Sequence, residues 1–226
     1  MGADKHGGRR AVFLDRDGVI NRNILNPATG EYEAPLMADD FEFLPGVLAA
    51  MCALRAAGFP LFLVSNQPNY AKGKSTRETL RSIHRKFLAG LARHDIKFAR
   101  FYYCFHHPEG IMAGYSYPCG CRKPSPHFLL KARADYDVDL GRSWMVGDRL
   151  SDIQCGHAAG TKTILIGTAQ LYRDGEIQPD EVAPDLLAAA KIIVAAPECS
   201  PEPPKSLPSH SSLCDMQRQP RPDGTY

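Results

Sequence analysis

The chain has 226 residues, 44% of them hydrophobic and 23% charged, which suits one sizeable core rather than two domains. Its 27 basic and 25 acidic residues nearly cancel, so overall charge supports neither a nucleic-acid nor a membrane partner. No stretch approaches the ~20 apolar residues of a membrane span, and no signal-peptide core follows the N-terminus. We therefore expect one cytoplasmic globular domain, monomeric rather than oligomeric.

Short apolar runs alternate with helical patterns along most of the chain. Strands are predicted at residues 11–15, 60–65, 99–104, 143–148 and 161–167, and helices from Val47 to about Gly58, over Leu80–Leu91, and at about 126–135, 151–159 and 184–195. Parallel neighbours need crossover connections, so this alternation predicts an α/β fold with a doubly wound parallel sheet, Rossmann-like, whose ligand lies at the carboxyl ends of the strands.

The composition changes at about residue 197. Residues 197–226 are rich in proline, serine and other polar residues and have no hydrophobic period, which predicts a disordered tail. The folded domain should therefore span residues 9–196.

Two carboxylates, Asp15 and Asp17, follow the first predicted strand in the sequence FLDRDG. Such a pair can share a cation, with one carboxylate attacking phosphorus while its neighbour handles the proton of the leaving group and then activates water. On this interpretation Asp15 is the nucleophile and Asp17 the acid/base. The alternative is an ordinary turn, because Asp and Gly favour turns for local reasons.

Three later segments add polar groups to the same predicted edge. A hydroxyl and backbone N–H groups follow the second strand, a cation pair precedes Pro124, and a further acid follows the fourth strand: Ser65-Asn66-Gln67, Arg122-Lys123, and Asp148 with Arg149 and Asp152 after it. Each segment could also have no role in binding or catalysis, for example as a solvated surface charge. Their order along successive strand ends favours a phosphate site with a metal.

The segments FLDRDG, VSNQ, RKP and VGDRLSD resemble the four motifs of the haloacid dehalogenase (HAD)-like phosphatases, across residues 11 to about 167. The resemblance implies that Asp15 is the nucleophile and that Asp17 is the acid/base and binds Mg²⁺ through its backbone carbonyl. It further implies phosphate binding by Ser65 and Lys123 and a third metal contact from Asp148. Asn66, Gln67 and Arg149 are candidate substrate contacts beside them.

Residues 104–121 contain two closely spaced pairs of metal-binding side chains, Cys104 with His106 and Cys119 with Cys121. Three thiolates and one imidazole make a closed tetrahedral zinc site, which is structural because it has no vacant position. A metal cross-link also reduces the entropic cost of ordering a long loop. His106 is preferred because its spacing matches that of the second pair, and His107 remains an alternative.

A Cys-x-His…Cys-x-Cys-Arg-Lys-Pro segment within these motifs resembles the D-glycero-D-manno-heptose 1,7-bisphosphate 7-phosphatases and the related histidinol-phosphate phosphatases. The resemblance implies that Arg122 binds a second, uncleaved phosphate. No helix-sized insertion for a large cap domain is visible, so the zinc loop should do part of a lid's work.

The sequence departs from the heptose enzymes at three positions. Pro68 and Asn69 stand where Ser-Gly is usual, which removes a backbone donor and a flexible residue from a substrate-facing loop. Arg149 replaces a common lysine and changes the geometry of that charge. These departures bear on the substrate and leave the predicted chemistry unchanged.

The predicted function is Mg²⁺-dependent hydrolysis of a small phosphorylated metabolite, a sugar phosphate and in particular the 7-phosphate of the heptose bisphosphate. Three alternatives stay open: a histidinol-phosphate phosphatase, a non-catalytic zinc-stapled binding module, and a nucleic-acid 3′-phosphatase. The acid set argues against the second, and the near-neutral charge against the third.

Overall fold

A six-stranded parallel sheet of order β5-β4-β1-β6-β7-β8 organises the chain. The structure is a computed structural model that describes residues 8–26, 30–167 and 177–196, so the predicted tail lies outside the described residues. The strands are β1 (Val12–Leu14), β4 (Leu61–Asn66), β5 (Arg100–Cys104), β6 (Trp144–Gly147), β7 (Lys162–Ile166) and β8 (Glu181–Ala183). All five neighbouring pairs are parallel, which confirms the predicted α/β fold.

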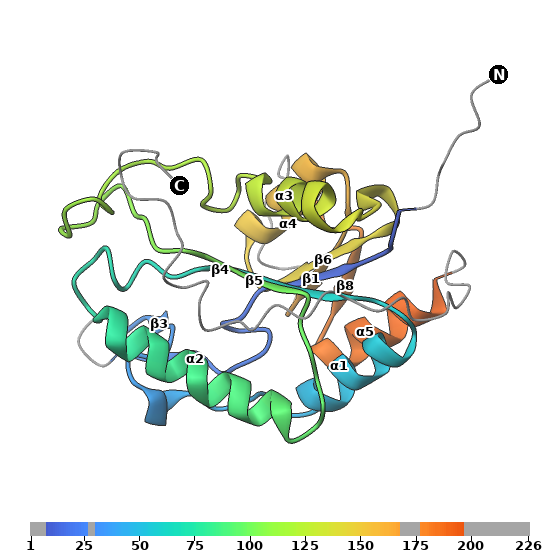
Figure 1. Cartoon of the computed structure of the whole chain (residues 1–226), viewed down its shortest axis with the longest axis horizontal. Coiled ribbons are helices and arrows are strands. Elements are labelled where there is room, and N and C mark those ends of the chain that lie inside the picture. Colours follow the sequence, from blue (N-terminus) through green and yellow to red (C-terminus); the bar gives the residue numbers. More distant parts are fainter. Residues whose placement is uncertain (1–7, 27–29, 168–176, 197–226) are drawn as a thin grey trace.

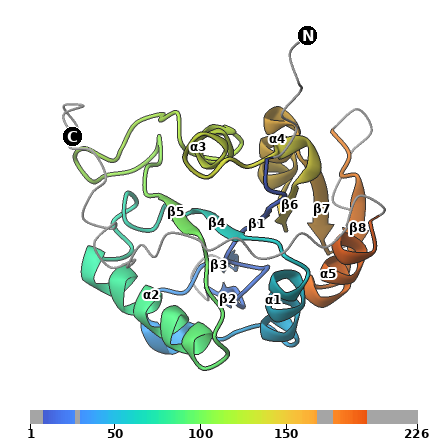
Figure 2. The same ribbon diagram turned by 45° about the vertical axis from the view of Figure 1, so that its right-hand side comes forward.

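Helices cover both faces of this sheet (Figure 1). They are α1 (Val47–Ala56), α2 (Arg77–Ala92), α3 (His127–Tyr136), α4 (Leu150–Ala159) and α5 (Leu186–Ala195), with 3₁₀ turns η1 (Ala38–Asp40) and η2 (Leu140–Arg142). Figure 1 and the turned view of Figure 2 show α3 and α4 on one face and α1, α2 and α5 on the other. None of the described helices is long and apolar enough to cross a membrane.

The side chains of β1 alternate between two apolar clusters, one on each face of the sheet. Val12 and Leu14 pack with the cluster that includes Met51 of α1, whereas Phe13 packs with the cluster that includes Leu129 of α3. Because the strand is buried on both faces, its residues form a continuous apolar run in the sequence. The strand ends at the point where Asp15 donates its backbone N–H to the carbonyl of Val146, at 3.0 Å.

Local signals fix the helix ends. Thr76 caps α2, because its Oγ1 accepts from the N–H of Thr79 at 3.1 Å, and Asp185 caps α5 through the N–H of Ala188 at 2.8 Å. α4 ends at Ala159 and is capped by Gly160, which has a positive φ of 81° as left-handed C-caps require. These residues set the observed boundaries, and α2 begins at Arg77, one turn earlier than its apolar pattern suggests.

The predicted strands omit the β2–β3 hairpin and β8. Strands β2 (Ile24–Leu25) and β3 (Tyr32–Glu33) pair antiparallel over two residues each, and β8 is largely exposed, so neither presents a continuous apolar run. Among the described residues between β1 and β4, the structure contains this hairpin, η1 and α1. The described residues of that segment form no cap domain.

Candidate active site

The strand ends named from the sequence meet in one cleft at the carboxyl edge of the sheet. The cleft is lined by Asp15, Asp17, Glu31, Tyr32, Glu33, Ala34, Asn66, Pro68, Asn69, Lys72, Lys74, Arg122, Lys123, Arg149, Ser151 and Asp152. Six of these are predicted catalytic or substrate-binding residues, and a seventh, Asp152, was named beside Asp148. The hairpin residues and the two lysines of the loop after β4 were missed, because nothing in their spacing links them to the strand ends.

Lys123 lies buried at the bottom of this cleft. Its Nζ contacts Asp15 Oδ1 at 2.9 Å, Asp152 Oδ1 at 2.6 Å and the carbonyl of Val64 at 2.7 Å. These two carboxylates hold the pKa of the Lys123 ammonium above its ordinary value despite the opposing effect of burial. A fixed cation beside Asp15 offsets the repulsion between an attacking carboxylate and an anionic phosphate.

Asp15 and Asp148 present oxygens that suit a magnesium ion. Carboxylate oxygens of Asp15, Asp148 and Asp152 lie within 4.8 Å of one another, and the buried Oδ1 of Asp148 has no hydrogen-bond partner in the described part of the chain. Burial, reinforced by neighbouring acids, raises the pKa of Asp148 to about 8; burial raises that of Asp15 to about 6, against the lowering effect of Lys123. A hard cation would relieve this crowding of negative charge.

Two glycines allow these acids to approach the backbone. Gly18 has a φ of 83°, and a Cβ there would lie 2.1 Å from Asp148 Oδ2. A Cβ on Gly147 would lie 2.1 Å from the Cβ of Asp152. Asp152 uses its other oxygen to accept from the N–H of Arg149 at 3.0 Å, so it orients both Lys123 and the start of α4.

The three polar residues at the end of β4 have different surroundings. The side-chain amide of Asn66 makes two reciprocal bonds to the backbone of Lys123, each 3.1 Å, and so fixes the lysine. Ser65 and Gln67 are 2% and 1% exposed. Gln67 lies behind the cleft, where its amide contacts Ser65 Oγ at 2.9 Å and Asp17 Oδ2 at 2.6 Å.

Arg16 and Asn21 are further residues of the site that sequence reasoning missed. Arg16 is 2% exposed, and its guanidinium donates to both carboxylate oxygens of Asp17. Asn21 Nδ2 donates to Asp17 Oδ1 at 3.0 Å. The position of Arg16 between two acids was visible in the sequence, but its burial was not.

The four predicted zinc ligands converge. Sγ–Sγ distances are 3.5 Å for Cys104–Cys119 and 3.5 Å for Cys119–Cys121, and His106 Nδ1 lies 3.8 and 3.6 Å from Cys104 and Cys121. A tetrahedral ion with Zn–S of ~2.3 Å separates sulfur ligands by roughly 3.8 Å, so the cluster fits zinc. His107 Nδ1 instead accepts from the N–H of Glu109, which favours His106.

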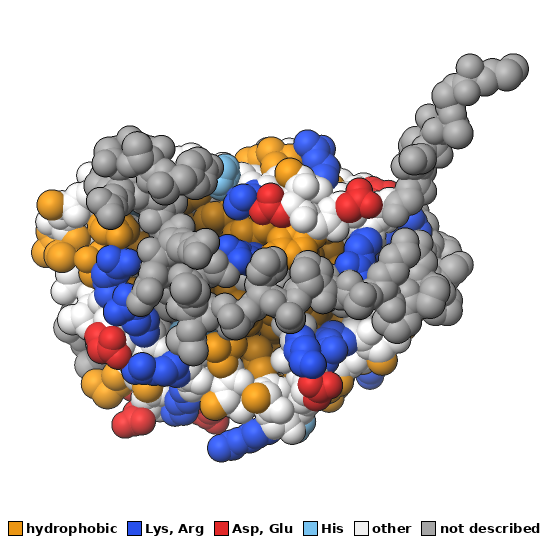
Figure 3. All heavy atoms as spheres, viewed as in Figure 1, with side chains coloured by type: hydrophobic (Ala, Val, Ile, Leu, Met, Phe, Trp, Pro, Cys, Tyr) orange, Lys and Arg blue, Asp and Glu red, His pale blue; other side chains and the backbone are white. Residues whose placement is uncertain are grey.

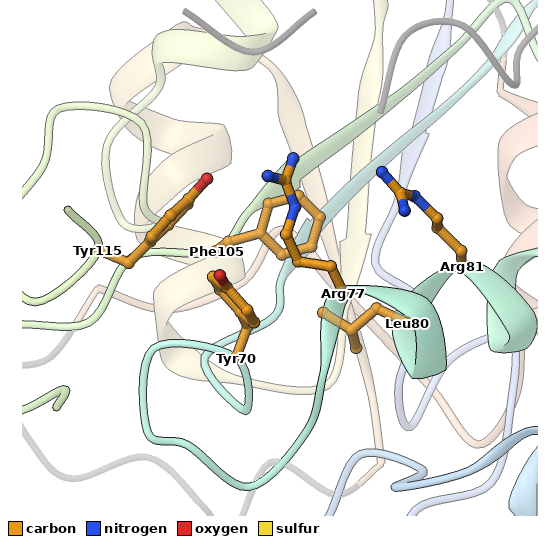
Figure 4. A pocket seen from close by; sticks show the side chains of 6 residues that line it. All are labelled: Tyr70, Arg77, Leu80, Arg81, Phe105 and Tyr115. Atoms are coloured by element: carbon orange, nitrogen blue, oxygen red, sulfur yellow. The ribbon is translucent and has the colours of Figure 1, made fainter. Parts of the chain in front are cut away.

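Residues 104–121, which carry these four candidate zinc ligands and are called the zinc loop, pack on the loop after β4. The N–H groups of Ile111 and Met112 both donate to the carbonyl of Ala71, at 2.7 and 3.0 Å, and the rings of Tyr70 and Tyr115 meet edge to face at 4.8 Å. A small hollow lies beside these rings, lined by Tyr70, Arg77, Leu80, Arg81, Phe105 and Tyr115 (Figure 4). The two loops therefore form one wall next to the cleft.

The order of the strands and the polar groups at the carboxyl edge of the sheet together define the class of protein. It is a hydrolase that acts on phosphate esters. The family model described as HAD-hydrolase-like matches residues 120–189, which contain the lysine and the third aspartate of the site.

Relatives of known name extend the match to most of the chain. The D-glycero-beta-D-manno-heptose-1,7-bisphosphate 7-phosphatase of Yersinia pestis is 36% identical over 187 residues, covering 82% of this chain and 95% of that protein. Its counterpart in Escherichia coli K12 is 39% identical, covering 74% and 80%. The D,D-heptose 1,7-bisphosphate phosphatase of B. bronchiseptica, solved with magnesium and phosphate, superposes with a TM-score of 0.69 at 31% identity, covering 82% and 98%. The chain belongs to the heptose-bisphosphate phosphatase family of the HAD-like hydrolases.

Proposed function

We propose that the chain is a Mg²⁺-dependent phosphatase that removes the 7-phosphate of D-glycero-D-manno-heptose 1,7-bisphosphate through an aspartyl-phosphate on Asp15. The observation that carries the proposal is the pairing of Asp15 with a buried lysine at 2.9 Å, beside an Asp148 oxygen that is buried without a partner among the described residues. The names of the relatives support the choice of substrate.

The residues of the site divide the reaction between them. Asp15 attacks phosphorus, Lys123 and the Ser65 hydroxyl hold the phosphoryl oxygens, and Asp17 transfers a proton to the leaving oxygen and later accepts one from water. Asp15, Asp148 and the backbone carbonyl of Asp17 would hold Mg²⁺, which when bound supplies positive charge opposite the phosphoryl group.

A second phosphate on the substrate would find cations in the cleft. Arg122 and Lys72 line it, whereas the acidic Glu33 is already paired with Lys74 at 2.6 Å and accepts from Asn26 at 2.9 Å. The hydrogen bond from Lys74 lowers the pKa of Glu33. These cations favour a bisphosphate over histidinol phosphate, whose amine would instead favour acidic contacts.

The proposal includes a structural zinc ion, held by Cys104, His106, Cys119 and Cys121. The proposed enzyme also comprises a domain of residues 9–196 and acts as a cytoplasmic monomer on a small metabolite. Figure 3 shows both basic and acidic side chains on one face of the molecule, and the formal net charge of +2 is in keeping with a small substrate rather than a nucleic acid.

Phosphate release with Mg²⁺ from a panel of phosphorylated metabolites tests the proposal. The heptose bisphosphate should have the highest kcat/KM, and Asp15→Asn should lose nearly all turnover while retaining the thermal melting curve of the parent. A strong preference for histidinol phosphate would overturn the substrate assignment. Full activity of Asp15→Asn would overturn the covalent mechanism.

A further inference from the structure

The side chain of Gln67 contacts two residues of the proposed reaction, Ser65, which would hold the phosphoryl group, and Asp17, which would protonate the leaving oxygen. Its Nε2 lies 2.9 Å from Ser65 Oγ and 2.6 Å from Asp17 Oδ2, and its Oε1 accepts from Arg16 Nη2 at 2.9 Å. An amide NH₂ has two hydrogens, so it can donate to both oxygens at once. Gln67 therefore uses its donors and its acceptor inside the protein.

These contacts determine which way the amide of Gln67 points. The reversed orientation would place the NH₂ group against the guanidinium of Arg16, and that contact would be repulsive. Ser65 Oγ then accepts from Gln67, which leaves the hydroxyl hydrogen of Ser65 to donate elsewhere. A phosphoryl oxygen in the cleft is the acceptor that the proposed reaction supplies.

Arg16 holds the same carboxylate from the other direction. Its Nε and Nη2 lie 3.1 and 3.0 Å from Asp17 Oδ1, and its Nη2 lies 3.2 Å from Oδ2. Asn21 adds a further donor at 3.0 Å. Both oxygens of Asp17 are thus fixed by neighbours that are themselves buried, and the planar fork of Arg16 sets the plane of the carboxylate.

We propose that Gln67 and Arg16 are positioning residues for Asp17, which they hold in the geometry for proton transfer to the leaving oxygen. The inference rests on the proposed phosphatase function and adds to it. In the step concerned, a bond forms between Asp15 and phosphorus, the bond from phosphorus to the leaving oxygen breaks, and the proton of the Asp17 carboxyl group moves to that oxygen. Misplacing Asp17 harms this step only when the leaving group needs a proton.

The test compares two leaving groups. For the parent and for Gln67→Met, kcat/KM is measured with 4-nitrophenyl phosphate, whose phenolate departs without protonation, and with an alkyl or sugar phosphate, whose alkoxide requires a proton. We choose kcat/KM because it reports steps up to departure of the leaving group. Gln67→Met should lose at least about tenfold on the alkyl ester, since general acid catalysis contributes ~10²–10⁴-fold, and less than about threefold on the aryl ester.

Three comparisons make the result specific. Asp17→Asn should show the same split, and adding Gln67→Met to it should cost little more, because both changes affect one proton transfer. Ser65→Ala should lose similar factors on both esters, since it affects the phosphate itself. Gln154→Met, on α4 and outside the cleft lining, is the matched control and should lose neither activity.

Equal losses on both esters, or no loss, in a folded Gln67→Met protein would overturn the inference. Should that variant fail to fold, Arg16→Lys replaces it, because lysine retains the buried charge without the planar fork. We expect the same difference between the two esters, and equal losses or no loss in Arg16→Lys would overturn the inference. The test is independent of the natural substrate, because any alkyl phosphate that the parent hydrolyses serves. A parent that hydrolyses no phosphate ester would instead overturn the proposed function.

Discussion

Lys123 places a buried ammonium between two buried carboxylates, Asp15 at 2.9 Å and Asp152 at 2.6 Å. Lys123→Met should therefore leave two acids facing each other without a cation. We expect loss of about 3–5 kcal/mol in the free energy of unfolding, as for a broken buried ion pair, and a fall in kcat of about 10²-fold or more. Urea unfolding and phosphate release measure the two effects.

Lys131→Met is the matched control for that substitution. Lys131 pairs with Asp135 at 2.9 Å, but both side chains are nearly half exposed, and such surface pairs contribute little. The control should change the free energy of unfolding by less than about 1 kcal/mol and leave turnover intact. If Lys123→Met destabilised no more than the control, the buried ion pair would not have the importance assigned to it.

Magnesium affinity should rise with pH. Burial raises the pKa of Asp148 to about 8 and that of Asp15 to about 6 in the metal-free protein. Because protons must leave these carboxylates before a metal binds, acid weakens binding. Calorimetry should show Mg²⁺ affinity increasing roughly tenfold or more from pH 6 to pH 8. Asp148→Asn should bind weakly with a flatter pH dependence, and equal affinities in the parent at both pH values would contradict the expectation.

At the scale of elements, the zinc loop should order the loop after β4 as well as itself. Cys121→Ser removes one of four clustered ligands, and Ala71 accepts from both Ile111 and Met112 of the zinc loop. We expect loss of bound zinc, measured by metal analysis, and faster hydrogen exchange in both loops, resolved by mass spectrometry. Cys52→Ser, on α1 and outside the cluster, should change neither. Unchanged exchange near Ala71 would mean that the loops are independent.

The elements predictable from sequence are those whose periodicity comes from burial. β1, β4 and β6 are buried along most or all of their length, so continuous apolar runs identify them. The β2–β3 hairpin has two-residue strands with exposed Leu25 and Tyr32. Its pairing depends on contacts distant in sequence, such as Lys74 with Glu33, which no local pattern encodes.

The site shows the same division. The acids, the hydroxyl and the lysine of the site could be predicted to lie together, because they follow parallel strands whose carboxyl ends meet at one edge of the sheet. The interior orientation of Arg16 and Gln67 depends on which side chains surround them in three dimensions, including Tyr103, whose ring lies 5.9 Å from the Arg16 guanidinium carbon. Sequence reasoning therefore named Gln67 as a substrate contact, whereas the structure places its amide behind the cleft.

For the whole molecule, the two metals should have separable effects. The proposed magnesium site lies at the edge of a sheet whose central strand β1 is buried between β4 and β6, so withholding Mg²⁺ should abolish turnover and leave circular dichroism unchanged. Zinc chelation should lower the melting temperature, because the metal cross-links a long loop. If withholding Mg²⁺ unfolded the protein, or if zinc-free protein kept its melting temperature, the division would be wrong.

β5 is an edge strand of the sheet, and the zinc loop departs from its carboxyl end. A segment attached at the rim can be lengthened, shortened or exchanged without threading new chain between existing strands. The acid pair, which follows the central strand β1, has no such freedom. This separation should allow the rim that faces the substrate to be changed while the chemistry at the acid pair stays the same.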